Sequence, residues 1–338
     1  MVQPVLLTHA RAPGDVTVMT ACIRDLALTH PGEYEIHVGT RWRELWENNP
    51  YIAGTHGLET GITPRYRLDY GPSMSRLASN RMHFIAAFHR ALSGVLKVDV
   101  PVLFSKPDLH LSEQERTEAP ISGRYWCVLA GGKTDMTAKI WSAARWQQTI
   151  DLLAERGINC VQVGALKRNH IQPALKNTLS LLDRTSLRDL VWLIHHADGV
   201  ICHVTCAMHM AAALDKPCVV LAGGREHWWW EAYTNAARTF GDRAAPVPVP
   251  HRFLHTQGLL ACCKDNGCWR NKVSSSEQDK KRSYCRYPCD DGFGQQYPTC
   301  MHLITPQHVV DAVLSYYEQC PTTHVSDLSS ANRDAAAD

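Results

Sequence analysis

Four residues whose side chains can bind a metal lie close together in CHVTCAMHMAAALDKP, residues 202–217: Cys202, His203, Cys206 and His209. Because Cys202 falls on the strand pattern DGVICHV, only Cys206 and His209, three residues apart, would share a helix face. The alternative is a strand that ends before a helix beginning near Thr205, where free N–H groups and the helix dipole attract phosphate. We favour this phosphate-binding interpretation.

A second phosphate-binding candidate is GGKTDMTAKIW, residues 131–141. The amides of Gly131 and Gly132, which follow a predicted strand, suit a diphosphate together with Thr134 and the ammonium of Lys139. The spacing matches neither GxxxxGK[ST] nor GxGxxG. A glycine turn with a surface lysine is the alternative interpretation.

A third candidate, GGREHWWWEAY, spans residues 223–233. Arg225 can face a phosphate and Glu226 a sugar hydroxyl, while the three tryptophans can stack on a sugar or base. Consecutive side chains cannot all point the same way, so at least one tryptophan should anchor this loop in the core.

The cysteines gather late in the chain, where six of the 13 lie within residues 262–300. Cys263-x4-Cys268 and Cys285-x3-Cys289, sixteen residues apart, approximate a zinc or iron knuckle, with Cys262 and Cys300 as further candidates. Such a structural metal would hold together a segment that has little hydrophobic core. Disulfides are the alternative, which a reducing cytoplasm disfavours.

Alternating apolar strand and helix patterns must position these motifs. They predict an α/β protein with one Rossmann-like domain over residues 1–115 and a second, with a parallel sheet, over residues 116–250. We expect a Cys-rich appendage over 251–303, a helix over 304–320 and a disordered tail over 321–338.

Composition agrees with two globular domains, since 45% of the 338 residues are hydrophobic and 20% are charged. The net charge of +2 gives no basic field of the kind that marks an obligate nucleic-acid binder. The sequence shows no leader pattern and no apolar run of membrane-spanning length, so we expect a cytoplasmic protein.

Three blocks together resemble glycosyltransferase family 9, the ADP-heptose:lipopolysaccharide heptosyltransferases: PGDVTVMTACIRDL, GGKTDMTAKIWSAARW and HVTCAMHMAAALDKPCVVLAGG. They occur in the family's order, and the third is the most specific. The resemblance implies the GT-B architecture, in which two Rossmann-like domains face a cleft and the final helix crosses back to the first domain. It also implies catalysis without a metal, which agrees with the lack of a DxD triplet.

The resemblance also implies roles for individual residues. Asp15 matches the base that deprotonates the acceptor hydroxyl, although capping its own helix is an alternative role. Lys139 matches the lysine that holds the donor diphosphate; Thr134, Thr205, the amide of Cys206 and His209 would lie near the phosphates. Val204 stands where the family has an aspartate, and VGALKRNH lacks the glutamate that contacts the nucleoside. We therefore expect a retained phosphate site with altered sugar and nucleoside contacts.

The sequence thus predicts an inverting glycosyltransferase that takes a sugar, such as a heptose, from a nucleotide-diphosphate donor, with ADP favoured. The acceptor would be a glycan, a protein side chain or a modified nucleobase, and the sequence does not indicate an oligomeric state. A nucleotide-sugar epimerase or hydrolase, with His9, His203 and His209 converging on the anomeric carbon, is the first rival. The second is a non-catalytic scaffold that assembles through the cysteine segment.

Overall fold

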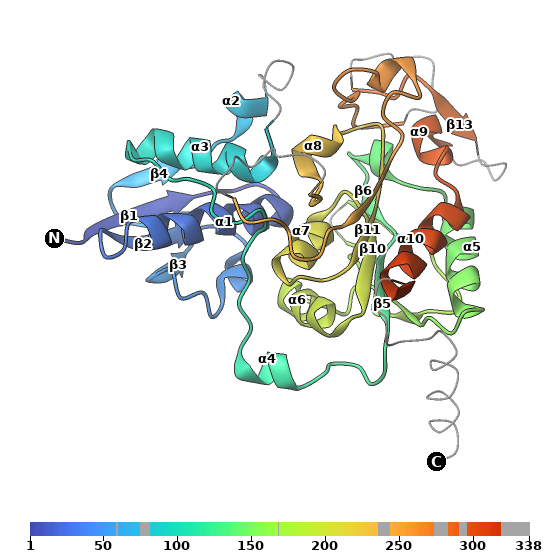
Figure 1. The fold of residues 1–338 in the computed structure, drawn as a ribbon, viewed down its shortest axis with the longest axis horizontal. Helices are drawn as coiled ribbons and strands as arrows, with labels where there is room; N and C mark the ends of the chain where they lie inside the picture. The colour runs from blue at the N-terminus through green and yellow to red at the C-terminus, as the bar shows by residue number, and fades with distance from the viewer. Residues whose placement is uncertain are drawn as a thin grey trace.

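The computed structural model describes residues 1–58, 60–74, 82–167, 169–235, 244–273, 283–290 and 296–318. Its two parallel sheets lie side by side, the first formed by the N-terminal part of the chain and the second by the C-terminal part (Figure 1). The predicted α/β class is therefore confirmed.

The first sheet has the strand order β3-β2-β1-β4, and all its pairs are parallel. Its centre is β1, whose Val5, Leu6 and Leu7 are fully buried. Pro13 begins α1 because its fixed φ and missing N–H suit the first helical turn. The elements are β1 (Gln3–Thr8), α1 (Pro13–Thr29), β2 (Tyr34–Gly39), η1 (Arg43–Trp46), β3 (Gly54–His56), β4 (Arg65–Arg67), α2 (Gly71–Met74) and α3 (Phe84–Leu96).

The second sheet has the order β12-β11-β10-β5-β7-β9, again parallel. Successive strand residues face opposite layers: Trp126 and Val128 pack towards α5 and α10, whereas Cys127 and Leu129 pack towards α6 and α7. The elements are β5 (Trp126–Leu129), α5 (Ala143–Ala154), β7 (Cys160–Gln162), β9 (Leu179–Ser180), α6 (Leu187–His196), β10 (Gly199–His203), α7 (Cys206–Ala213), β11 (Cys218–Gly223) and β12 (Arg252–His255).

One continuous core joins the two sheets, because buried residues of α1 and α3 belong to the same cluster as those of α6, α7 and one face of the second sheet. The polar connection between the sheets contains a short helix, α4 (Glu113–Thr117), which begins with a capping box at Ser112. The first domain thus packs directly against the second.

The remaining elements are short and lie around the second sheet. They are β6 (Gly132–Lys133), η2 (Thr137–Lys139), β8 (His170–Ile171), α8 (Trp228–Glu231), η3 (Ala261–Cys263), β13 (Pro288–Asp290), β14 (Gln296–Pro298) and α9 (Thr299–His302). The cysteine-rich segment, which contains η3, β13, β14 and α9, lies at one end of the second domain (Figure 1).

The last helix corrects one expectation. As far as the chain is described, α10 (Pro306–Glu318) packs on α5, β11 and β12 of the second domain, rather than crossing back to the first. Its buried Val309, Val310 and Val313 explain this, because they complete the apolar layer over Ile201 and Val219. The tail predicted over residues 321–338 lies outside the described residues.

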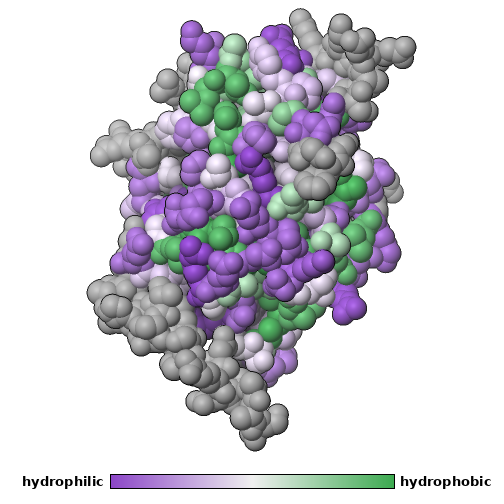
Figure 2. Space-filling model, turned by 90° about the vertical axis from the view of Figure 1, so that its right-hand side faces the viewer, coloured by the Kyte–Doolittle hydropathy of each residue, from purple (hydrophilic) through white to green (hydrophobic). Residues whose placement is uncertain are grey.

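The face that carries α5 and α10 is mostly hydrophilic, with apolar residues in small, separate groups (Figure 2). No helix in the described part of the chain combines the length and apolar character needed to span a bilayer.

Candidate functional site

The two domains meet where α1 and α7 begin. A Cβ atom on Gly14 would lie 3.2 Å from Cδ2 of His209 and 3.3 Å from the Cα of Cys206. Glycine suits this close approach, since a Cβ atom here would press on the His209 ring and on the backbone of α7. It brings Asp15, the next residue along α1, to the N-terminal turn of α7.

The first turn of α7 has the features expected of a phosphate site. Thr205 occupies the N-cap position in an extended conformation, and its side chain makes no capping bond. Its Oγ1 is buried, with no hydrogen-bond partner among the described residues. An anionic ligand could accept hydrogen bonds from this hydroxyl and from the free amides at the start of the helix.

The metal-type side chains around this turn do not converge. His203 accepts a hydrogen bond from Trp141 N–H at 3.1 Å, and Cys202 Sγ lies 3.9 Å from Cys218 Sγ. Nδ1 of His209 lies 2.7 Å from the hydroxyl of Tyr233, and burial holds the pKa of His209 well below its usual value. His209 is therefore a neutral, packed side chain, while burial raises the pKa of the Cys206 thiol to about 11.

Lys139 ends η2 and reaches the carboxyl end of β10. Its Nζ lies 3.3 Å from the carbonyl oxygen of Val204 and 2.6 Å from Oε1 of Glu226. Burial lowers the pKa of Lys139 to about 8; Arg225 acts in the same sense, and Glu231 and Asp15 oppose it. The ammonium predicted to hold a diphosphate is thus already paired with a carboxylate.

Glu226 is buried between two cations. Its side chain is 1% exposed and also forms an ion pair with Arg225. The second oxygen, Oε2, has no partner among the described residues. One oxygen therefore pairs with both cations, whose combined charge exceeds that of the carboxylate, and the other is free to accept a hydrogen bond from a ligand.

The glycine loop has another role in this structure. A Cβ on Gly131 would come within 2.2 Å of the Ile171 carbonyl oxygen, since β6 and β8 pair immediately beside it. The amide of Thr134 donates to Asn169 at 2.8 Å, and the Thr134 side chain is exposed. Gly131, Gly132 and Thr134 thus lie along a short antiparallel pairing between β6 and β8, and phosphate contact by this loop remains a prediction.

Asp15 is held at both carboxylate oxygens. The amide of Ala12, the N-cap residue of α1, donates to Oδ2 at 2.9 Å, so Asp15 caps the helix from position N3 and not as the N-cap residue itself. The hydroxyl of Tyr70 donates to Oδ1 at 2.6 Å. Sequence reasoning missed Tyr70, because one tyrosine after a short strand carries no spacing signal.

Two of the three tryptophans anchor their loop in the core, which confirms that part of the prediction. Trp229 and Trp230 are each 1% exposed, and Trp230 stacks on Phe84 with ring centroids 5.1 Å apart. Glu231, at the end of α8, is buried near Lys139, Arg225 and Asp15, and burial raises its pKa. Glu231 lies within the third candidate motif, but sequence reasoning assigned it no role.

The cysteine-rich segment forms hydrogen bonds with Arg225, which lies in the loop after β11. The Arg225 side chain donates to the Arg270 carbonyl and, at 2.7 Å, to Oδ1 of Asn271. The Asn271 carbonyl accepts from the amide of Ala138, next to Lys139, at 2.9 Å. The segment therefore fixes both loops that carry cations at the candidate donor site.

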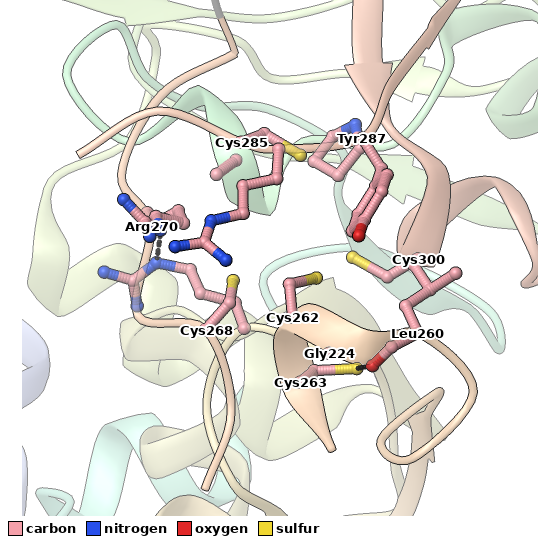
Figure 3. A pocket seen from close by; sticks show the side chains of 13 residues that line it. Gly224, Leu260, Cys262, Cys263, Cys268, Arg270, Cys285, Tyr287 and Cys300 are labelled. Carbon is pink, nitrogen blue, oxygen red and sulfur yellow. Dashed lines mark hydrogen bonds between the residues drawn. The ribbon is translucent and has the colours of Figure 1, made fainter. Parts of the chain in front are cut away.

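Five cysteines line one cavity beside this segment, together with three arginines (Figure 3): Cys262, Cys263, Cys268, Cys285, Cys300, Arg225, Arg270 and Arg286. The thiol of Cys263 is already hydrogen-bonded within the protein, because its Sγ donates to the Leu260 carbonyl at 3.3 Å. Cys289 lies in the β13–β14 hairpin, where its Sγ contacts the Tyr297 carbonyl at 3.3 Å, and it is not among the lining residues. Of the four predicted ligands, only Cys263, Cys268 and Cys285 reach the cavity.

The cavity contains the sulfur ligands that a thiolate metal site needs, but their side chains do not converge on one point. No three His, Cys, Asp or Glu side chains in the described ranges are placed to hold a metal ion. Burial, together with the neighbouring sulfurs, raises the pKa of Cys262 to about 11 and that of Cys300 to about 12. These two thiols therefore stay protonated unless a metal displaces the proton.

Comparison with known proteins identifies the family of the chain. Residues 65–250, more than half of the chain, match the profile of glycosyltransferase family 9 (heptosyltransferase). No curated protein matches the sequence at a significant level.

Solved structures match the fold at low identity. A family 9 glycosyl transferase from Veillonella parvula is 14% identical, with a TM-score of 0.61 over 93% of this chain and 96% of that one. The E. coli ADP-heptose LPS heptosyltransferase II is 17% identical, with a TM-score of 0.60 over 94% and 99%. The dodecameric iron-containing heptosyltransferase TibC, from enterotoxigenic E. coli and solved with ADP-D-β-D-heptose, is 15% identical, with a TM-score of 0.62 over 94% and 76%.

Two Rossmann-like domains that meet at a helix N-terminus lined by a lysine define a nucleotide-sugar glycosyltransferase of the GT-B class. The family follows from the profile match: the chain belongs to glycosyltransferase family 9.

Proposed function

We propose that the chain transfers a heptose from an ADP-heptose donor to a hydroxyl of a glycan, with inversion. Heptosyltransferase II and TibC, which share the fold, support this choice of donor. The near-neutral charge of the chain favours a glycan acceptor over a nucleobase in a nucleic acid, which would need a basic binding surface. We place the reaction in the cytoplasm.

The observation that carries the proposal is the contact between the two helix starts at Gly14 and Cys206. It sets the carboxylate of Asp15 beside a turn with free amides and the unpartnered Oγ1 of Thr205. A general base and an anion site must be neighbours for a hydroxyl to attack the anomeric carbon as the diphosphate leaves.

The remaining groups would stabilise the departing diphosphate. Lys139 and Arg225 supply positive charge, while Thr205 and the first amides of α7 supply hydrogen bonds. The free oxygen of Glu226 would accept a hydrogen bond from a hydroxyl of the donor sugar. His209 would support α7 by packing, because it is neutral and engaged with Tyr233.

The histidine arrangement disfavours an epimerase. Nδ1 of His9 donates to the Leu68 carbonyl at 2.8 Å, while His203 is bonded to Trp141 and His209 lies against Tyr233. Each ring is engaged with a different element, so they do not form the convergent acid–base set that epimerisation would need. The second alternative, a non-catalytic scaffold protein, would be excluded by a measurement of catalytic activity.

The test of the proposed function is a thermal-shift screen with ADP, UDP, GDP and ADP-D-β-D-heptose, repeated with Lys139→Ala. We expect ADP and ADP-heptose to raise the Tm of the wild type and to raise that of the variant much less. Equal stabilisation of both proteins would remove Lys139 from the donor site. Loss of ADP release in Asp15→Asn, with donor binding retained, would separate an enzyme from a scaffold.

We further propose that a structural zinc or iron draws Cys262, Cys268, Cys285 and Cys300 together when it binds, since these side chains share a cavity but are not yet placed to hold an ion. This set differs from the one that spacing suggested. All four line one cavity, and Arg270 and Arg286 can offset the charge of four thiolates. Metal analysis should find about one ion per chain, lost in Cys300→Ser and kept in Cys289→Ser. The reverse result would restore the spacing-based set, and no metal in the wild type would reject the site.

A further inference from the structure

We propose that Tyr70 is a positioning residue that fixes the carboxylate of Asp15 for proton abstraction from the acceptor. This inference rests on the proposed function, in which Asp15 is the base. It adds a residue that neither the motifs nor the family match assigns.

The hydrogen bond from Tyr70 to Asp15 is short and direct. The phenol donates to Oδ1 at 2.6 Å, while the amide of Ala12 donates to Oδ2 at 2.9 Å. With one donor on each oxygen, the carboxylate cannot rotate freely, and its remaining lone pairs point in fixed directions. Burial and the charge of Asp15 raise the pKa of Tyr70, so the phenol keeps the proton that it donates.

The ring of Tyr70 is itself immobilised. It is 6% exposed and packs edge-on against Phe84 at 4.6 Å between centroids. Phe88 lies 5.2 Å and Trp230 6.4 Å from it, so rings from both domains enclose the tyrosine. A phenol held this way can orient Asp15 relative to the donor site on the second domain.

Other charges face the pair from each side. The guanidinium of Arg11 lies 4.7 Å from the centre of the Tyr70 ring and pairs with Asp69. His9, Lys139 and Glu231 interact electrostatically with Asp15. None of these three is held on the carboxylate by a described hydrogen bond, so Tyr70 is the side chain that sets its direction.

The test measures ADP release from ADP-D-β-D-heptose in water for wild type, Tyr70→Phe, Asp15→Asn and the double variant. We expect Tyr70→Phe to lower kcat about tenfold, as loss of a hydrogen bond to a charged group does. The donor KM should stay unchanged, and the acid limb of the pH profile should move up by about half a unit to one unit. In the Asp15→Asn background, the second change should have no further effect.

The matched control is Tyr125→Phe, which removes another buried phenol whose hydroxyl donates to the Leu193 carbonyl at 2.9 Å. It should lower the Tm to a similar degree and leave kcat and the pH profile unchanged. If Tyr70→Phe keeps the wild-type kcat and pH profile while Asp15→Asn is inactive, the positioning role of Tyr70 is overturned and Asp15 remains the base. Full ADP release by Asp15→Asn would instead overturn the assignment of the base.

Discussion

Replacing Glu226 with glutamine should destabilise the empty enzyme and strengthen its binding of ADP. In the structure the Glu226 carboxylate is 1% exposed and is the direct ion-pair partner of both Lys139 and Arg225. Without it, two buried cations lose their counter-charge, which costs about 3–5 kcal/mol. At roughly 2 °C per kcal/mol for a chain of this size, the Tm should fall by about 6–10 °C.

A bound diphosphate restores the missing negative charge. In the wild type it would approach the Lys139 ammonium against the repulsion of Glu226, which at about 4 Å and an effective dielectric constant near 20 is about 4 kcal/mol. If only a third of that repulsion is relieved in Glu226→Gln, ADP should bind about tenfold more tightly. The variant should therefore also show a larger rise in Tm with ADP than the wild type.

Calorimetric titration with ADP and thermal denaturation with and without ADP measure both effects. The control is Glu115→Gln, which breaks the ion pair of Glu115 with Arg188 in the connection between the domains. It should lower the Tm without changing ADP affinity. Weaker ADP binding by Glu226→Gln would refute the reasoning, because it would mean that the diphosphate does not occupy the Lys139 side of the site.

Three further predictions concern the same region. ADP affinity should fall as the pH rises through about 8, where the Lys139 ammonium loses its proton, and Lys139→Arg should flatten that dependence; a flat wild-type titration would contradict the charge assignment. Asn271→Ala should weaken ADP binding about threefold to tenfold by releasing Arg225, as measured by calorimetry, and unchanged affinity would uncouple the cysteine-rich segment from the donor site. Gly14→Val should lower ADP release far more than ADP affinity, because its side chain would push α1 away from His209; equal losses would point to general unfolding.

The alternation of the second domain could be predicted because β5, β7, β10 and β11 are fully buried and α6 begins with a capping box at Ser186. In the first domain, Pro13 at the start of α1 is a similar signal. The two-residue strands β6 and β8 could not be predicted, since two residues have no periodicity. Their pairing depends on Gly131, whose contacts come from residues 171 and 172.

The candidate site divides in the same way. Lys139 and Thr205 could be proposed because each lies in a recognisable local pattern at a strand end or helix start, and Asp15 because its segment resembles the family's first block. Tyr70 and Glu231 could not, because only tertiary packing brings them near those residues. Spacing also could not separate Cys289 from Cys300, since the folding of the loop decides which sulfur reaches the cavity.

The hydroxyl of Tyr316 has a consequence for the order in which the chain folds during synthesis. It donates to the Pro250 carbonyl at 2.8 Å and accepts from the Arg252 amide at 3.1 Å, so α10 holds the start of β12, the last strand to join the sheet. A ribosome must therefore release residue 316 before these hydrogen bonds can form. Until then β12 is held on the nascent sheet by its pairing with β11 and lacks the support of α10, so this edge of the second domain is less protected against wrong pairing.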